Sequence, residues 1–369
     1  MASLSRWCTT SMLTILVAAS AFSAESSNPE IRWVDARTLR LEGKGWSETA
    51  SYYDRLPAKA HGVVRAPVWN LSRNSAGMLI RFETDAREIH ARWALTSANL
   101  AMPHMAATGV SGVDLYVRGK AGGKWRWLAV GQPKAQTNSV ALVKGLPAGH
   151  REYLLYLPLY NGLSSLEIGV PAGAVLRSDG VGREERKPVV FYGTSILQGG
   201  CASRPGMAHV AILGRRFDWP VINLGFSGNG KMEPEMGGFI AELDAAVFVL
   251  DCLPNMTEAE VAKRIEPFVK TLRARYARTP IVLVEDRTYA DAFMQQGRHE
   301  RNEGARRELK AAWQRLKSSG VKQLYYVKGD RLLGDDGEAT VDGSHPTDLG
   351  FVRQAEVLAK VLKPLLKHQ

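Results

Sequence analysis

Four short segments in the second half of the chain carry the residue types that acyl transfer needs. Ser195 follows a Gly-Thr pair, Gly228 lies in a glycine-containing segment, Asn255 follows a proline, and Asp342 precedes His345 by three residues. A serine hydroxyl is a weak nucleophile until a neighbouring base takes its proton, and a third group must hold that base in the correct tautomer. Ser195, His345 and Asp342 are therefore the candidate nucleophile, base and orienting carboxylate.

An oxyanion that develops during ester cleavage needs preorganised hydrogen-bond donors. The backbone N–H groups of Ser195 and Gly228 and the side-chain amide of Asn255 can supply them. Each signal alone has a simpler interpretation: a Gly-Thr-Ser triplet is usually a turn, an Asp-x-x-His is often an exposed turn or a metal ligand, and Asn255 could cap a helix. The order and placement of the segments favour the catalytic interpretation.

The elements around these segments predict a doubly wound α/β fold. Short, nearly all-apolar runs alternate with longer segments of helical character, and this pattern is typical of a parallel sheet covered by helices on both faces. Ligands bind outside the carboxyl ends of such strands, so all four segments should open onto one rim. The predicted strands are Val189–Tyr192, Val221–Leu224, Ala245–Leu250, Ile281–Val284 and Leu324–Val327, and the main predicted helices are Glu258–Ala277 and Arg301–Ser318.

The first half of the chain predicts an antiparallel β-sandwich instead. Apolar and polar residues alternate in Ile80–Glu83, Ile89–Trp93 and Leu166–Val170, and a period of two fits strands with one buried face. Gly122-Gly123 between two such runs indicates a hairpin turn. No amphipathic helix is expected between residues 31 and 175.

These motifs together resemble the SGNH/GDSL hydrolases. Tyr192–Ser195 is similar to the first block of that family, Asn223–Gly228 to the second, Leu253–Asn255 to the third and Asp342–Pro346 to the last. Gly112–Tyr116 is similar to the Gly-x-Asp-Leu-Tyr motif of a jelly-roll-like β-sandwich that precedes some of these hydrolases. The resemblance covers nearly the whole chain after the N-terminal segment.

The resemblance implies a triad of Ser195, His345 and Asp342 and an oxyanion hole of Ser195, Gly228 and Asn255. Two departures from the family pattern stand in the sequence. Thr194 replaces the Asp that usually stands beside the serine, and that Asp is not a triad member. Leu253 and Met256 replace the residues that usually flank the asparagine of the third block. The second departure makes Asn255 the least supported of the residues assigned to the oxyanion hole.

The N-terminus has the layout of a cleavable secretory signal. Arg6 is followed by the apolar run Met12–Ala19 and by small residues up to Ala24. We therefore expect a signal peptide at residues 1–24, a β-sandwich domain at 28–178, an SGNH hydrolase domain at 187–369, and a secreted or periplasmic protein. A buried N-terminal helix or an uncleaved anchor is the alternative.

Composition excludes several classes of function. The chain of 369 residues carries a formal net charge of +11, but its basic residues are scattered and form no stripe interleaved with aromatics, so we expect no nucleic-acid partner. No segment after the N-terminus is apolar enough to span a membrane, so we expect no stable membrane insertion. The sequence has no clustered metal-ligand spacing, Walker-type loop or dinucleotide fingerprint, so we expect no metal and no cofactor.

Two of the three cysteines, Cys201 and Cys252, lie outside the predicted signal. In a flavodoxin-like strand order the first and third strands are neighbours, and these cysteines follow those strands. We therefore expect them to lie close together and to form a disulfide, with two unrelated buried thiols as the alternative.

The sequence thus predicts an exported serine esterase that removes short acyl groups, with acetyl as the first candidate, from a small-molecule or polysaccharide ester. A lipase or thioesterase for longer acyl chains is the alternative among hydrolases. A carbohydrate-binding protein on an inactive hydrolase scaffold is the alternative from another class. His104 and His209 could border the cleft, but we interpret both as packing or surface residues.

Overall fold

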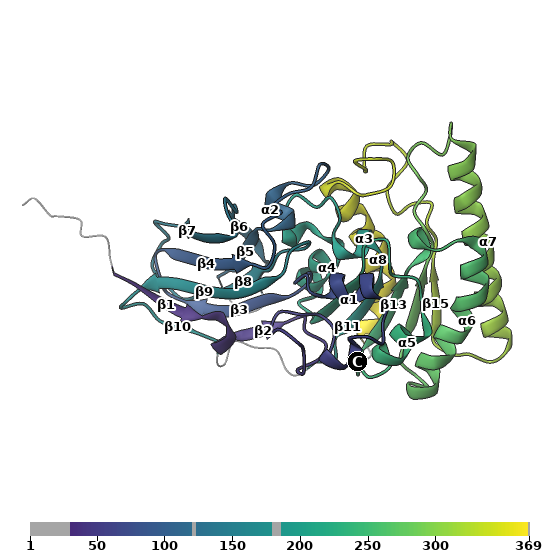
Figure 1. Cartoon of the computed structure of the whole chain (residues 1–369), viewed down its shortest axis with the longest axis horizontal. Helices are drawn as coiled ribbons and strands as arrows, with labels where there is room; N and C mark the ends of the chain where they lie inside the picture. The colour runs from purple at the N-terminus through teal and green to yellow at the C-terminus, as the bar shows by residue number, and fades with distance from the viewer. Residues whose placement is uncertain (1–29, 120–122, 179–185, 368–369) are drawn as a thin grey trace, which may run out of the picture.

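The structure is a computed structural model that describes residues 30–119, 123–178 and 186–367. Figure 1 shows strands stacked at one end of the molecule and a helix-covered sheet at the other, with the chain passing from the first to the second. The signal peptide predicted at residues 1–24 lies outside the described residues. None of the described helices is long and apolar enough to cross a membrane.

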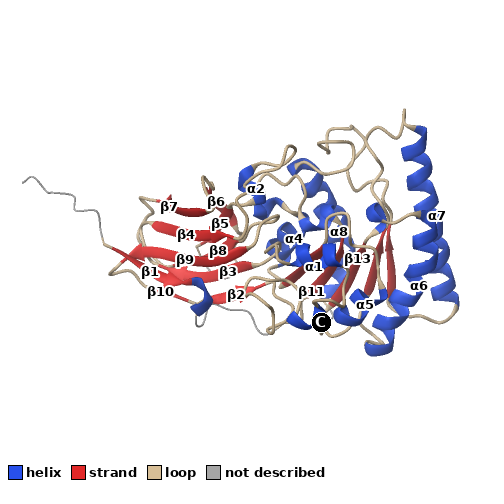
Figure 2. Ribbon diagram, in the orientation of Figure 1, coloured by secondary structure: helices blue, strands red, loops and turns tan. Residues whose placement is uncertain are grey.

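The first half contains two antiparallel sheets, as predicted (Figure 2). One has the order β1 (Ile31–Asp35), β9 (Leu163–Pro171), β4 (Ile89–Leu95) and β7 (Thr137–Val143). The other has the order β10 (Leu176–Arg177), β3 (Leu79–Thr84), β8 (Arg151–Tyr156), β5 (Val113–Arg118) and β6 (Arg126–Gly131), and β2 (Arg40–Glu42) pairs with β3.

The two sheets bury a shared apolar core between them. Along β4 every second side chain is buried, which confirms the period of two seen in the sequence. Trp93 from one sheet and Phe82 and Tyr153 from the other belong to the same core, and the last two rings stack with centroids 5.2 Å apart. This packing is that of a β-sandwich.

The second half is built on a five-stranded parallel sheet. Its strand order is β12 (Val221–Gly225), β11 (Val189–Gly193), β13 (Val247–Asp251), β14 (Ile281–Val284) and β15 (Leu324–Val327). Every residue of the first four of these strands is buried. The five predicted strands are confirmed, and the first and third strands in the sequence are neighbours, as the flavodoxin-like order requires.

Helices cover both faces of this sheet, so the prediction of a doubly wound fold is confirmed. One face packs against α5 (Pro234–Ile240), α6 (Glu258–Arg275) and α7 (Gln296–Ser318), and the other against α4 (His209–Phe217) and α8 (Asp348–Leu366). Helix α6 begins at a capping box in which Thr257 and Glu260 bond reciprocally to each other's backbone N–H. Short helices complete the chain: α3 (Ser195–Gln198), η1 (Ala36–Thr38), η2 (Ala58–Ala60), η3 (Pro205–Met207) and η4 (Leu253–Asn255).

Besides η1 and η2, the described part of the first half contains two short α-helices that the sequence did not predict, α1 (Ala66–Ser72) and α2 (Ala107–Val110). Neither is long enough to show a helical period in the sequence. Leu56, Val64 and Val68 from the segment around α1 are buried in the core beneath the parallel sheet. Tertiary packing against the second half, rather than local pattern, therefore supports this segment.

Candidate active site

Ser195 lies at the carboxyl edge of the parallel sheet, where β11 turns into α3. The residue is only 7% exposed. The preceding Gly193 packs so closely against β13 that a Cβ there would stand 2.3 Å from the carbonyl oxygen of Asp251. As the first residue of α3, Ser195 has a backbone N–H without an intrahelical acceptor, so it can serve as a donor to a substrate.

His345 and Asp342 complete a hydrogen-bonded chain that ends on Ser195. The Ser195 Oγ lies 2.8 Å from His345 Nε2, and His345 Nδ1 lies 2.7 Å from Asp342 Oδ2. The other carboxylate oxygen, Oδ1, accepts from the backbone N–H of Ser344 at 3.0 Å and of His345 at 2.8 Å. Gly343 makes this tight turn possible with a φ of +85°, a conformation that costs glycine no steric strain. The structure thus brings the three predicted residues together.

The environment of Asp342 keeps it ionised. Partial burial raises the pKa of Asp342, but the N–H donors of His345 and Ser344 and the His345 ring outweigh burial and hold the pKa below its ordinary value. A carboxylate on Nδ1 orients the imidazole so that Nε2 can accept the proton of the Ser195 hydroxyl.

Gly228 and Asn255 lie on the two loops that follow β12 and β13, Asn255 in the short helix η4, and these loops contact each other. Gly228 has a φ of +67°, and no atom lies within 4 Å of the position that a Cβ would take, so this loop leaves open space. The Asn255 amide can donate from Nδ2 to the Phe226 carbonyl oxygen at 3.3 Å; turned over, its oxygen accepts from the N–H groups of Asn229 and Gly230 at 3.0 and 3.2 Å. Either orientation joins the two loops.

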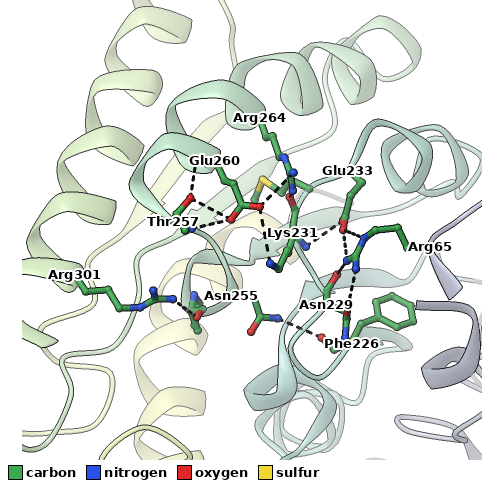
Figure 3. A network of polar contacts seen from close by, with 12 residues as sticks. Arg65, Phe226, Asn229, Lys231, Glu233, Asn255, Thr257, Glu260, Arg264 and Arg301 are labelled. Carbon is green, nitrogen blue, oxygen red and sulfur yellow. Dashed lines mark hydrogen bonds and ion pairs between the residues drawn. The ribbon is translucent and has the colours of Figure 1, made fainter. Parts of the chain in front are cut away.

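Three arginines from distant parts of the chain brace these two loops (Figure 3). Arg65, just before α1, donates to Asn229 Oδ1 at 2.8 Å and to its carbonyl oxygen at 2.9 Å, and it pairs with Glu233. Arg264 donates to the Lys231 carbonyl oxygen at 2.9 Å. Arg301 donates to the carbonyl oxygen of Pro254, the residue before Asn255, at 2.8 Å. Sequence reasoning missed all three, because no local pattern links an arginine to a carbonyl that folding brings beside it.

Residues of the first half also contact Ser195 and the segments near it. The Tyr160 hydroxyl donates to the Ser195 carbonyl oxygen at 3.1 Å. The Gln198 side chain donates to the Leu159 carbonyl oxygen at 3.0 Å and accepts from the Ser227 N–H at 3.1 Å, so it joins the β-sandwich half to the glycine loop. The fully buried Arg55 donates to the Gly225 carbonyl oxygen at 2.6 Å.

The two other histidines considered in the sequence, His104 and His209, lie in different environments. His104 is exposed, as expected of a surface residue, but it also lies at the site: its ring centroid is 5.9 Å from that of His345. His209 is buried, as a packing residue should be, and stacks on Phe351 with centroids 5.8 Å apart. Its two ring nitrogens have no hydrogen-bond partner within the described part of the chain, and burial followed by the charge of Arg287 lowers the pKa of His209 well below its ordinary value.

The predicted Cys201–Cys252 disulfide is not formed, because both residues are buried free thiols. Their strands are neighbours, but Cys201 follows its strand by eight residues and belongs to the active-site side, where burial and then the Asp342 charge raise its pKa to about 12. The Cys252 thiol donates instead to the Tyr192 carbonyl oxygen, in the core beneath the sheet. The alternative of two unrelated thiols describes the structure.

Asp114, at the centre of the Gly-x-Asp-Leu-Tyr motif, ties the two halves together. It is fully buried, and its carboxylate accepts from Arg204 Nη1 at 2.8 Å, the Gly206 N–H at 2.8 Å and Trp127 Nε1 at 2.9 Å. Burial raises the pKa of Asp114, against the opposing effect of Arg204. Across residues 30–119, 123–178 and 186–367, no group of three or more His, Cys, Asp or Glu side chains could hold a metal ion.

Comparisons with known proteins agree with this architecture. The model of the GDSL-like lipase/acylhydrolase family matches residues 186–363, and the model of the N-terminus of SGNH-hydrolase-type esterases, named for its GxDLY motif, matches residues 31–176. A search of curated proteins finds no significant match.

Among solved structures, a Bacteroides ovatus protein described as a GDSL-like lipase is 38% identical with a TM-score of 0.86, covering 92% of this chain and 98% of that one. A salicylyl-acyltransferase from a tetracycline biosynthetic pathway is 20% identical (TM-score 0.72; 91% and 97% covered). A family two carbohydrate esterase from Clostridium thermocellum is 16% identical (TM-score 0.57; 79% and 93% covered). The last two share the fold. The extent and identity of the first match, together with the two family models, show that this chain belongs to the GDSL-like lipase/acylhydrolase family of carboxylic ester hydrolases, with the N-terminal domain of SGNH-type esterases.

Proposed function

We propose that this protein hydrolyses short acyl esters, acetyl esters first, on carbohydrates outside the cytoplasm. The observation that carries the chemistry is the hydrogen-bonded chain from Ser195 through His345 to Asp342, with distances of 2.8 and 2.7 Å. The carbohydrate part is supported by the predicted export signal and by the shared fold with a carbohydrate esterase.

In the proposed reaction the Ser195 hydroxyl attacks the ester carbonyl carbon while His345 Nε2 takes its proton. The carbonyl oxygen becomes an oxyanion, held by the N–H groups of Ser195 and Gly228 and the amide of Asn255. The bond to the alcohol oxygen then breaks, and the imidazolium of His345 returns the proton to the leaving alcohol. Water, deprotonated by His345, attacks the acyl-enzyme and releases the acid and the free Ser195 hydroxyl.

Hydrolysis of p-nitrophenyl acetate tests the proposal. Ser195→Ala should lose turnover by about 10⁴-fold or more, with an unchanged melting temperature, because the change removes only a hydroxyl. Ser164→Ala is the matched control, because Ser164 lies on the β-sandwich and donates only to a backbone oxygen in the same sheet. Turnover by Ser195→Ala at the rate of the control would refute the assignment of Ser195 as the nucleophile. Binding of acetylated polysaccharide without turnover by the wild-type protein would instead support a carbohydrate-binding protein.

One observation favours the alternative of a longer acyl chain. Phe293 and Met294 are 85% and 77% exposed on the loop before α7, and this loop contacts the His345 turn through a hydrogen bond from the Ala290 N–H to the Gly343 carbonyl oxygen at 2.9 Å. Exposed apolar side chains beside a site can bind an acyl chain. A series of p-nitrophenyl esters from acetate to palmitate separates the two: kcat/KM should be highest for acetate, whereas an optimum at eight carbons or more would favour a lipase.

A further inference from the structure

A tight turn of the first half, Met102–Met105, places His104 beside the candidate catalytic histidine. Met102 and Met105 exchange two backbone hydrogen bonds of 3.0 Å, so Pro103 and His104 form the tip of the turn. The His104 and His345 rings are inclined at 57° with centroids 5.9 Å apart. The His104 side chain is exposed and makes no hydrogen bond within the described residues.

The turn is anchored, so His104 is held at this place. Met105 is 4% exposed and packs in the same apolar cluster as Ile196, the residue after Ser195. The chain then enters α2, where the Thr108 hydroxyl donates to the Ser203 carbonyl oxygen and Gly109 passes so close to Ala202 that a Cβ would stand 2.2 Å from its carbonyl oxygen. Met102, before the tip, also packs against this cluster, so both sides of the turn are fixed and the tip residue has a defined position.

The His104 ring is close enough to His345 to reach an alcohol that receives its proton from that histidine. The alcohol oxygen must come within hydrogen-bond reach of His345 Nε2, about 3 Å, to receive its proton. The carbon atoms next to that oxygen, and their substituents, then lie a few ångströms farther from His345, a length comparable with the 5.9 Å between the two ring centroids. In the proposed reaction Gly228 and Asn255 bind the acyl oxygen. Gly200 lies against the Cδ2 edge of the His345 ring, because a Cβ on Gly200 would stand 3.4 Å from His345 Cδ2.

We propose that His104 determines specificity by hydrogen-bonding a hydroxyl on the carbon adjacent to the ester oxygen of the leaving alcohol. An imidazole offers one donor and one acceptor in its neutral form, which suits a hydroxyl, and an alcohol without that hydroxyl gains nothing from it. The substrate class is therefore a monoacylated vicinal diol, as in a partly acetylated sugar. This inference rests on the proposed function, because it needs His345 to protonate the alcohol.

A pair of matched esters tests the inference: trans-2-hydroxycyclohexyl acetate and cyclohexyl acetate differ only in the adjacent hydroxyl. The wild-type protein should prefer the hydroxy ester by about 10-fold in kcat/KM, the effect of one hydrogen bond. In His104→Phe, which keeps a ring but has no donor or acceptor, the ratio should fall to near 1. His104→Gln should retain part of the preference. His150→Phe, an exposed histidine on the β-sandwich, is the control and should keep the wild-type ratio.

Two results would overturn the inference: a wild-type ratio near 1, or an unchanged ratio in His104→Phe. An unchanged ratio with an equal loss on both esters would indicate that His104 only positions His345. Failure of the proposed function has a different signature, because the wild-type protein would then not hydrolyse p-nitrophenyl acetate, or would do so equally after Ser195→Ala. Circular dichroism of each variant excludes misfolding as the cause of a changed ratio.

Discussion

The two sides of the candidate site are held in place by different means. On the proton-transfer side, Asp342 bonds to residues two and three positions along the chain, so a single turn holds the base and its orienting group. On the oxyanion side, the loops of Gly228 and Asn255 are braced by Arg65, Arg264 and Arg301, which lie 164, 33 and 47 positions from the residues they hold. The bonds between the base and its carboxylate are local, although Ala290 and Arg298 also donate to carbonyl oxygens of this turn. The oxyanion side depends on contacts that reach into the first half of the chain.

This difference has a consequence for mutational effects. Changes on the proton-transfer side should remove a chemical group and abolish turnover. Changes to the braces on the oxyanion side should leave every reacting group in place and displace donors, which lowers kcat by less.

The largest effect is expected for His345→Ala, because it removes the base that takes the Ser195 proton. The kcat for p-nitrophenyl acetate should fall by about 10⁴-fold or more, and Ser195→Ala combined with His345→Ala should be little worse than either alone, since the two residues act as one unit. His150→Ala is the control. Additive losses in the double variant would show that the two residues act separately.

A smaller loss is expected for Asn255→Ala, because one of several oxyanion donors is removed. The expected loss in kcat is about 10²- to 10³-fold, with KM changed much less, since the donor acts mainly in the transition state. Asn70→Ala, an exposed asparagine on α1, provides the comparison. If Asn255→Ala retained kcat within threefold of the wild-type value, Asn255 would not belong to the oxyanion hole.

Arg65→Met should lower kcat by about 10-fold without a matching change in KM, because a loop displaced by a fraction of an ångström misplaces the Gly228 donor. Lys59→Met is the matched control, since Lys59 also comes from the first half, pairs with a glutamate of the second and loses the same charge. Arg65→Lys should recover part of the activity. Equal effects of Arg65→Met and Lys59→Met would mean that the brace has no specific role.

The smallest effect on catalysis is expected for a substitution of the buried Asp286, which should change the free energy of unfolding instead. Burial, with a smaller contribution from Asp251, raises the pKa of Asp286 to about 6, against the opposing charges of Arg287 and Arg306. The folded protein therefore holds this proton more tightly than the unfolded chain, so ionisation of Asp286 lowers stability as the pH rises from about 4 to above 6.

Asp286→Asn lacks this ionisation. Its free energy of unfolding relative to the wild-type protein should therefore increase by about 2 kcal/mol between pH 4 and pH 7. Urea denaturation of both proteins at the two pH values measures the difference. A difference that is independent of pH would show that Asp286 titrates at its ordinary pKa in the folded protein.

The sequence predicted the parts of the molecule whose signals are local. The all-apolar strands, the alternation in β4 and the Asp342–His345 turn can each be read from a few neighbouring residues. The fold class then placed Ser195 and His345 at one edge, although 150 residues separate them.

The rest required the fold, because its causes are contacts between distant segments. Arg65, Tyr160 and His104 have no motif of their own and acquire a role only where the first half meets the second. Neighbouring strands also gave a misleading signal for Cys201 and Cys252, since the seven residues between Gly193 and Cys201 carry that thiol away from the core.

The central claim is that Ser195, activated by His345, forms the acyl-enzyme, and active-site labelling tests it most directly. A p-nitrophenyl organophosphate should modify the wild-type protein once, peptide mapping by mass spectrometry should place the adduct on Ser195, and labelling of His345→Ala should be slower by orders of magnitude. A stoichiometric adduct on another serine, or equally fast labelling of His345→Ala, would contradict the claim.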